Sequence, residues 1–508
     1  VPIIAVTTTG GGARAMTALY GTLSGLKKLN LLDCVFYITG ASGSTWGISN
    51  LYEDAEWSQK DLDVPIENAR RNVCKDKKSS FSLEKILKYR EEMKKRAEMG
   101  YKTSFTDIWG LVIESMFHNG DGKTTLSNQR KAVERGQNPL PLCLAMNVKH
   151  IENTTLDFKE WCEFSPYEVG LLKYGAYIRS EDFASSFYMG RLIKKLPESR
   201  ICFLQGNATG QALKSGRYTD VLLVKLMIRN LVVGNTPKLM YRGNISSSPP
   251  STLHTEGTGG RRHMDGPKNT PGMQVIHKAQ AGEHHGCKEL ESSVHATCQY
   301  SAPMSAFCAV FWGSLKITVA NFLSDTELDK FPNKLTPYSD DLCLVDSAYY
   351  INASFPPLLR EERKVDVILS FDYGLAERFK SVEQTHEYCC NQKIAFPKVN
   401  LTDNDREKPK ECHVFTKSED LEAPILLHFP LVNDTFRTHK APGVKRSPEE
   451  MEGGAVEIEG RSPYSLLKLT YSKENFDKLL NLTEYNVMNN EEAILLALRD
   501  AIAQKQKS

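Results

Sequence analysis

Ser42 is the residue of this sequence whose type and neighbours most directly suggest a catalytic role. Residues 35–38 are apolar or aromatic and predict a buried strand, residues 39–44 are all small, and a helical pattern follows. A serine on so tight a strand-to-helix turn projects its hydroxyl near the positive end of the helix. This arrangement is the nucleophile elbow of serine hydrolases. A plain turn rich in glycine and serine is the alternative, because the G-x-S-x-[GS] spacing also arises by chance.

The glycines at 10–12 form a second candidate element, between an apolar strand at 2–6 and a helix at 13–29. Such a loop offers backbone N–H groups to an anion, which is either a bound phosphate or the oxyanion of a reacting ester. Arg14 follows the loop and could hold a phosphate or a carboxylate. A tight turn with a solvated arginine remains the alternative.

Two aspartates each follow a predicted buried strand. Asp346 comes after residues 342–345, and Asp372 ends the apolar run 365–371. An acid in this position is common in the active sites of α/β enzymes and equally common as a helix N-cap. The pattern alone does not choose between the two roles for either aspartate.

The order of elements explains how these residues would meet. Strand, helix, strand and helix at the start of the chain predict a parallel sheet, and ligands bind at the carboxyl ends of such strands. Residues 53–138 read as mostly helical, and 158–204 as well-packed irregular structure. Further strands are predicted at 139–148 and 424–432, and helices at 476–482 and 491–503.

Composition narrows the class of protein. The 508 residues are 41% hydrophobic and 25% charged with a net charge of +2, so nothing points to nucleic acid. No apolar run approaches the roughly 18 residues of a membrane span. The twelve cysteines read as reduced intracellular thiols. The start lacks both an initiator methionine and a signal peptide, so we expect a fragment of a longer protein.

Residues 235–300 are rich in Gly, Ser, Thr, Pro and His and show no periodicity, which predicts a mobile insertion or lid. The histidines and cysteines at 284–298 match no zinc-binding spacing, so no metal is assigned.

Six segments, taken in order, resemble the catalytic domain of the cytosolic (group IV) phospholipases A2, within the patatin-like lipases. The C-terminal half resembles the delta, epsilon and zeta branch of this family more than the alpha form. The segments are G-G-G-A-R-A at Gly10–Ala15, G-A-S-G-S-T-W at Gly40–Trp46, Ser165–Gly175, Leu344–Ala348, Val365–Asp372 and Ala441–Val444.

The resemblance implies a fold and a domain organisation. The expected fold is a three-layer α/β/α patatin-like domain with a cap or lid insertion. Residues 1–508 would form one catalytic domain, with its core at 1–204 and 320–508 and an atypical cap or lid at 205–319. The N-terminal C2 lipid-binding domain of the family is absent from this sequence.

The resemblance also implies roles for single residues. Ser42 would be the nucleophile and Asp346 its partner in a Ser–Asp dyad without histidine. Gly11 and Gly12 would form the oxyanion hole, and Arg14 would contact the lipid phosphate. Ala41 stands where the family usually has leucine.

The implied function is a calcium-regulated cytosolic phospholipase A2 or lysophospholipase that cleaves glycerophospholipid acyl esters through an acyl-serine. Calcium would act through the missing C2 domain, and the enzyme would sit in the cytoplasm, peripherally on intracellular membranes. The alternatives are a phosphatidylethanolamine N-acyltransferase using the same acyl-enzyme, an inactive lipid-binding or trafficking module, and a nucleotide-binding α/β protein. The oligomeric state stays open.

Overall fold

The computed structural model describes residues 1–118, 122–147, 160–207, 317–321, 340–416, 423–460, 462–466 and 468–506. All of these belong to one compact unit. The expected lid at 235–300 lies outside the described residues, as does the group of histidines and cysteines at 284–298.

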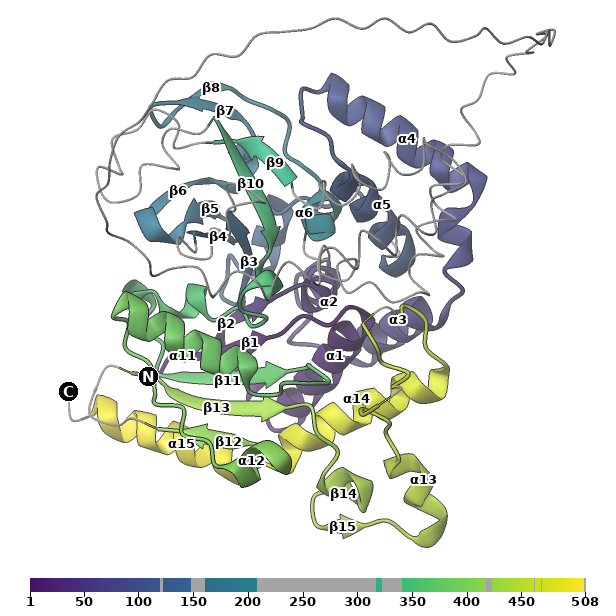
Figure 1. Cartoon of the computed structure of the whole chain (residues 1–508), viewed down its shortest axis with the longest axis vertical. Coiled ribbons are helices and arrows are strands. Elements are labelled where there is room, and N and C mark those ends of the chain that lie inside the picture. Colours follow the sequence, from purple (N-terminus) through teal and green to yellow (C-terminus); the bar gives the residue numbers. More distant parts are fainter. Residues whose placement is uncertain are drawn as a thin grey trace, which may run out of the picture. The chain divides into compact units, whose positions relative to one another are not determined.

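The first half of the chain alternates strands and helices and then forms a run of strands (Figure 1). Its elements are β1 (Ile4–Thr8), α1 (Ala13–Lys28), β2 (Val35–Gly40), α2 (Gly43–Leu51), α3 (Asp63–Cys74), α4 (Leu83–Glu98), α5 (Phe105–Phe117), β3 (Leu140–Asn147), β4 (Glu160–Phe164), β5 (Glu168–Leu171), β6 (Ala176–Arg179), β7 (Ser186–Tyr188), β8 (Arg191–Lys194) and α6 (Ile201–Asn207).

The second half completes the sheet and ends in two long helices. Its elements are β9 (Ile317–Ala320), β10 (Asp341–Asp346), β11 (Val367–Asp372), α11 (Lys380–Gln392), α12 (Asp403–Glu407), β12 (His413–Phe415), β13 (Ile425–Pro430), β14 (His439–Ala441), β15 (Val444–Lys445), α13 (Met451–Gly454), α14 (Lys473–Met488) and α15 (Glu491–Lys505).

A mixed sheet in the order β12-β13-β11-β1-β2-β3-β4-β5-β6 forms the centre of the unit. Strands β13, β11, β1, β2 and β3 run parallel to one another, as the β-α-β-α start predicts. The predicted strands at 2–6, 35–38, 139–148, 342–345, 365–371 and 424–432 are all present, with bounds shifted by a few residues.

Helices cover both faces of the parallel part. Every residue of β1 and β11 is buried, which requires cover on each side. On one face, Ala5, Ile368 and Leu426 pack with Val382 of α11. Helix α1 packs along α14 and against α2. The fold class expected from the sequence, an α/β three-layer domain, is confirmed.

The expectation of irregular structure at 158–204 is wrong. The described part of this stretch forms the antiparallel strands β4 to β6 and the separate hairpin β7–β8. Its strands have three to five residues, so they are too short for a period to stand out in the sequence.

Strand β3 brings the two candidate catalytic segments together. The last residue of β2, Gly40, pairs with Cys143 of β3. The last residue of β10, Asp346, pairs antiparallel with Ala145, two positions further along β3. The opposite edge of β3 is taken by β4. Strands β2 and β10 therefore end next to each other along one edge of β3.

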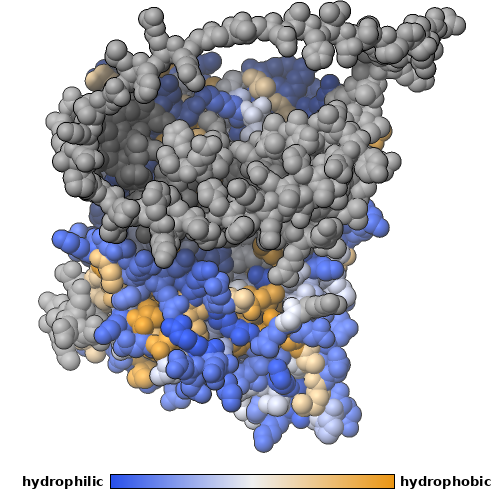
Figure 2. All heavy atoms as spheres, viewed as in Figure 1, coloured by the Kyte–Doolittle hydropathy of each residue, from blue (hydrophilic) through white to orange (hydrophobic). Residues whose placement is uncertain are grey.

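The surface of the described residues in Figure 2 is mostly hydrophilic, with smaller apolar areas between the polar ones. Within the described ranges, no helix has both the length and the apolar character needed to cross a membrane.

Candidate active site

Ser42 lies in a strained turn between β2 and α2. Its backbone has φ 50° and ψ −123°, a region that side chains other than glycine rarely occupy. The turn is braced by Ser44, whose hydroxyl accepts from the Ala41 N–H at 3.0 Å and donates to the Ala41 carbonyl at 2.8 Å. The structure therefore has the nucleophile-elbow geometry that the sequence predicts at this serine.

The glycine loop lies directly against this elbow. A Cβ atom added to Gly43 would stand 2.1 Å from the Gly12 carbonyl oxygen and 2.6 Å from two further backbone atoms of Gly12. Gly12 itself has φ 59°, which again favours glycine. Only residues without side chains allow this approach. The loop and the elbow thus lie side by side, as the order of strands and helices predicts.

The N–H groups of Gly11 and Gly12 are free to donate. In the part of the chain that the structure describes, neither N–H donates a hydrogen bond, whereas the Gly10 N–H is held by Asn352. Both precede the first turn of α1, where the helix dipole favours negative charge. Two unpaired donors beside Ser42 are what an oxyanion hole needs.

Asp346 is buried beside Ser42. Its Oδ1 accepts a hydrogen bond from the Ala348 N–H at 2.9 Å, and its Oδ2 is buried without a hydrogen bond of standard geometry to any described residue. Burial raises the pKa of Asp346, and donor interactions from the Ala348 N–H and the Ser42 hydroxyl offset part of that rise. The resulting pKa is about 7.

Asp372, the other candidate, has both of its oxygens occupied. Oδ1 accepts from the Gly374 N–H at 2.8 Å and from the Thr9 hydroxyl at 3.4 Å, and Oδ2 accepts from the Ser381 hydroxyl at 2.9 Å. These contacts fix the turn that follows β11. Asp372 is a structural aspartate here, so the geometry separates two residues that the sequence pattern could not.

A buried serine–histidine pair lies elsewhere in the sheet. The Nδ1 of His428 on β13 is 3.2 Å from the Ser370 hydroxyl, and its Nε2 is 2.8 Å from the Arg378 carbonyl oxygen. Burial lowers the pKa of His428. Both side chains are completely buried, so the pair has no access for a substrate.

Arg14 is buried and holds two backbone carbonyls. Its Nε donates to the Tyr373 carbonyl and its Nη1 to the Tyr464 carbonyl, each at 2.6 Å. The solvated-arginine alternative is therefore wrong. Two of the Arg14 donors are thus engaged in joining segments far apart in the sequence. The lipid-phosphate contact expected for Arg14 stays a prediction.

A cavity of about 50 Å³ adjoins Asp346. Its lining is mostly apolar and is drawn from α2, β3, β4, α6 and β10; it includes Ile48, Leu144, Phe164, Leu204 and Leu344. This volume holds a water molecule or two. An acyl chain would enter only if these side chains moved apart.

Asn352 and Ser354 complete the site and were missed by the sequence analysis. Asn352 binds the Gly10 N–H, and the Ser354 hydroxyl donates to the Gly40 carbonyl at 2.8 Å. Both follow Asp346 in a loop without regular structure, where no periodic pattern could mark them. The described residues contain no cluster of three or more His, Cys, Asp or Glu side chains suited to a metal ion.

Comparisons with known proteins find relatives of this chain. A family model described as a lysophospholipase catalytic domain matches residues 4–231. Human cytosolic phospholipase A2 delta is 45% identical over 507 residues, covering 99% of this chain and 59% of the relative. Human cytosolic phospholipase A2 epsilon is 42% identical over 521 residues, covering 100% of this chain and 57% of the relative.

The fold matches a solved structure of the same kind. The structure of human GIVD cytosolic phospholipase A2 superposes with a TM-score of 0.76 at 41% identity, covering 99% of this chain and 61% of that chain. Its complex with methyl gamma-linolenyl fluorophosphonate gives a TM-score of 0.72 at 39% identity, covering 99% and 60%. The chain thus spans about three fifths of the length of the relatives it matches.

Proposed function

The chain belongs to the cytosolic phospholipase A2 family, and from that membership we propose that it hydrolyses acyl esters of glycerophospholipids through Ser42 and Asp346. One observation carries the proposal. Asp346 is buried, has a pKa of about 7 and interacts with Ser42, which is held in a strained elbow. Its Oδ2 makes no hydrogen bond of standard geometry to any other described residue. A base of this pKa is matched to proton transfer near neutral pH.

The proposed reaction has two halves. Asp346 takes the Ser42 proton as the serine oxygen attacks the ester carbonyl, and the N–H groups of Gly11 and Gly12 donate to the developing oxyanion. The tetrahedral intermediate collapses, the C–O bond to the lysophospholipid breaks, and Asp346 returns the proton to the leaving oxygen. Water then attacks the acyl-Ser42 ester and gives a proton to Asp346. The bond between the acyl carbon and the Ser42 oxygen breaks, Asp346 returns the proton to that oxygen, and the fatty acid is released.

Burial is what makes an aspartate adequate for this role. A carboxylate in water has a pKa near 3.9 and is a poor base towards a serine hydroxyl. Removal from water raises the pKa of Asp346, and with it the carboxylate's affinity for the serine proton. The oxyanion donors then lower the barrier by about 3–4 kcal/mol each.

The finer parts of the proposal concern the whole protein. We assign residues 1–204 and 320–508 to the catalytic core, and 205–319, most of which lie outside the described residues, to a cap or lid. We assign calcium regulation to a C2 domain of the whole protein and place the enzyme in the cytoplasm, peripherally on intracellular membranes. Their support is the likeness to proteins named cytosolic phospholipases A2, of which this chain spans three fifths.

Labelling with a fluorophosphonate probe tests the proposal, because such probes form a stable bond to an activated serine. Wild-type protein should be labelled at Ser42, Ser42→Ala should not be labelled, and Asp346→Asn should react at least about a hundredfold more slowly. The double variant should be little worse than either single variant, since the two residues act as a unit. Release of free fatty acid from phosphatidylcholine then identifies the hydrolase, and formation of N-acylated phosphatidylethanolamine would identify the acyltransferase instead.

Ser370→Ala is the matched control, because Ser370 is a buried serine beside a histidine. It should keep the wild-type labelling rate. Loss of labelling in Ser370→Ala and His428→Ala, together with normal labelling of Asp346→Asn, would replace the Ser–Asp dyad by a serine–histidine site.

A further inference from the structure

The hairpin β7–β8 exposes an unusual amount of apolar surface. It pairs only with itself among the described strands. Four of its apolar side chains are exposed, with exposed fractions of 55% for Tyr188, 58% for Met189, 40% for Leu192 and 66% for Ile193. A two-stranded hairpin gains nothing in stability by exposing such residues, so the patch points to a contact with another surface.

The turn of this hairpin is strained in a way that keeps a methionine at its tip. Tyr188 pairs with Arg191, so Met189 and Gly190 form a two-residue loop, with φ 47° and 74°. Turns with positive φ at both central residues favour asparagine, aspartate or glycine at the first of them. Methionine there costs roughly 1 kcal/mol in backbone strain. The sequence thus places an apolar side chain where turn chemistry favours a polar one.

The charged residues of the hairpin itself have one sign. Residues 183–197 read F-A-S-S-F-Y-M-G-R-L-I-K-K-L-P and contain Arg191, Lys194 and Lys195 but no acidic residue. All three basic side chains are exposed, and Lys195 is paired with Asp182 below the hairpin. An apolar tip with a basic collar complements an anionic lipid surface, where each basic residue contributes about 1 kcal/mol.

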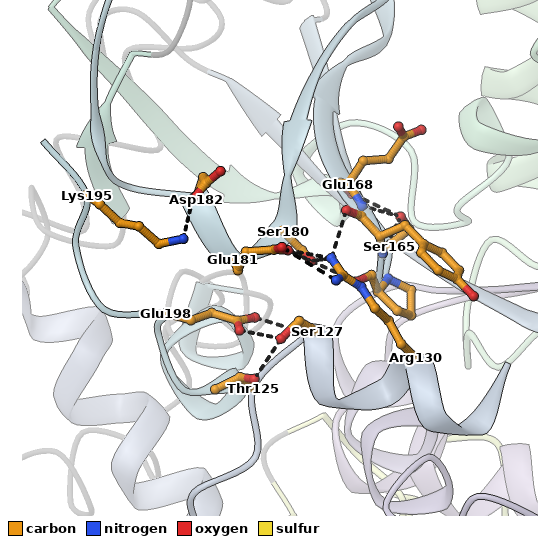
Figure 3. A network of polar contacts seen from close by, with 12 residues as sticks. Thr125, Ser127, Arg130, Ser165, Glu168, Ser180, Glu181, Asp182, Lys195 and Glu198 are labelled. Atoms are coloured by element: carbon orange, nitrogen blue, oxygen red, sulfur yellow. Dashed lines mark hydrogen bonds and ion pairs between the residues drawn. The ribbon is translucent and has the colours of Figure 1, made fainter. Parts of the chain in front are cut away.

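The base of the hairpin is held firmly, as Figure 3 shows. Lys195 bridges to Asp182 at 2.8 Å across its two ends, and the Ser127 N–H donates to Glu198 at 2.8 Å just beyond β8. Just before β7, Glu181 accepts from Arg130. These contacts fix the two ends of the hairpin to the rest of the unit.

The hairpin also connects to the cavity that adjoins Asp346. Phe187 of β7 packs on the apolar cluster that contains Phe164, Phe183 and Leu344. The same three residues line the cavity beside Asp346. A contact made at the hairpin is therefore continuous, through packed side chains, with the walls of the cavity.

We propose that the β7–β8 hairpin is a membrane-docking element that inserts Met189 and Ile193 into an anionic lipid surface, with Arg191 and Lys194 contacting the headgroups. This inference rests on the proposed function, since a lipid ester substrate lies in such a surface. It adds to that function the element that makes the contact.

Vesicle co-sedimentation of the full 508-residue chain without calcium tests the proposal. All variants are made on Ser42→Ala, so no lipid is consumed and the result does not depend on hydrolysis. Met189→Asn should lower the partition coefficient onto phosphatidylserine-containing vesicles roughly tenfold, and Ile193→Ser should do the same. Arg191→Glu with Lys194→Glu should abolish the preference for phosphatidylserine over pure phosphatidylcholine vesicles.

Met189→Asn separates docking from folding, because asparagine suits the turn better than methionine and should leave the melting temperature unchanged or raise it. Val64→Ser is the matched control, since Val64 is 70% exposed on α3, outside the hairpin, and should change the partition coefficient less than twofold. Unchanged partition of Met189→Asn and Ile193→Ser would overturn the proposal. So would a loss of self-association in these variants without a loss of vesicle binding, which would make the patch a protein interface. Normal vesicle binding without fluorophosphonate labelling, both measured on the chain that keeps Ser42, would refute the hydrolase and not the docking element.

Discussion

The side-chain oxygen of Asn352 lies 3.1 Å from the backbone nitrogen of Gly10 and accepts its hydrogen bond, and the Asn352 backbone carbonyl accepts the same N–H at 3.2 Å. This double contact joins the glycine loop to the segment that follows Asp346. It uses the first N–H of the loop for support and leaves the next two, at Gly11 and Gly12, to the oxyanion.

Asn352→Ala should loosen the glycine loop without touching the reacting atoms. Because oxyanion donors act only if they are aligned, we expect kcat on a soluble monomeric ester to fall roughly ten- to a hundredfold with KM little changed. Asn352→Asp keeps an acceptor at the same place and should recover part of the loss. Equal losses in kcat and in folded protein, measured by thermal unfolding, would show a purely structural role.

The pH dependence of the reaction should follow Asp346. The carboxyl must be ionised to accept the Ser42 proton, and its pKa is about 7, so kcat/KM should rise with pH and level off above that value. The measurement is a kcat/KM profile from pH 5 to 9 on a soluble ester. A profile already flat at pH 5 would contradict a buried aspartate base.

Stability should change with pH in the opposite sense. The pKa of Asp346 is higher in the folded protein than its ordinary value of 3.8, so the folded state favours the protonated form and loses stability as pH rises towards 7. Asp346→Asn, which stays neutral, should therefore stabilise the fold at pH 8 by about 2–4 kcal/mol and have little effect at pH 4. Chemical denaturation at the two pH values checks this. Destabilisation by Asp346→Asn at pH 8 would mean that the carboxylate is held by a partner charge.

Arg14 distinguishes binding of a phosphate from support of the backbone. Lysine keeps the charge but not the planar fork that reaches the carbonyls of Tyr373 and Tyr464. If Arg14 also grips a lipid phosphate, Arg14→Lys should retain more activity than Arg14→Ala, with a larger loss on phospholipids than on uncharged esters. Equal losses on both substrate types would leave Arg14 with the structural role alone.

Gly43→Ala should separate the elbow from the oxyanion loop. A methyl group at Gly43 meets three backbone atoms of Gly12 within 2.6 Å, and backbone cannot move aside as a side chain can. We expect fluorophosphonate labelling to fall more than a hundredfold, because misalignment by about 1 Å can cost that much. Gly453→Ala, which would meet only the end of the Arg446 side chain at 3.2 Å, is the control and should label normally.

The sequence predicted the parts of the fold that depend on local pattern. The apolar runs at β1, β2, β11 and β13 and the glycine- and serine-rich loops between them were identified because burial on both faces and tight turns each leave a direct compositional signal. The helices α14 and α15 are predicted by a local pattern too, because apolar residues recur at helical spacing, although α14 begins before the predicted residue 476.

The features that the sequence does not predict depend on contacts between distant parts of the chain. Where β4 to β8 lie, the sequence predicts irregular structure, because such short strands are defined by the strands they pair with. Asp346 and Asp372 look alike in sequence, and only the donors around each carboxyl separate them. Asn352 acts through a single contact with Gly10, for which local sequence holds no signal.

The alignment of β2 and β10 along one edge of β3 also bears on how the protein can be changed by evolution or by engineering. Ser42 and Asp346 lie on opposite sides of residues 208–316 in the chain, yet each is positioned by its register on β3. A slip of either strand by one residue along β3 would move Ser42 and Asp346 apart by about 3.3 Å and turn the side chains of the shifted strand to the other face of the sheet. An insertion of one residue within β10 should therefore destroy the pair even though every catalytic side chain is kept.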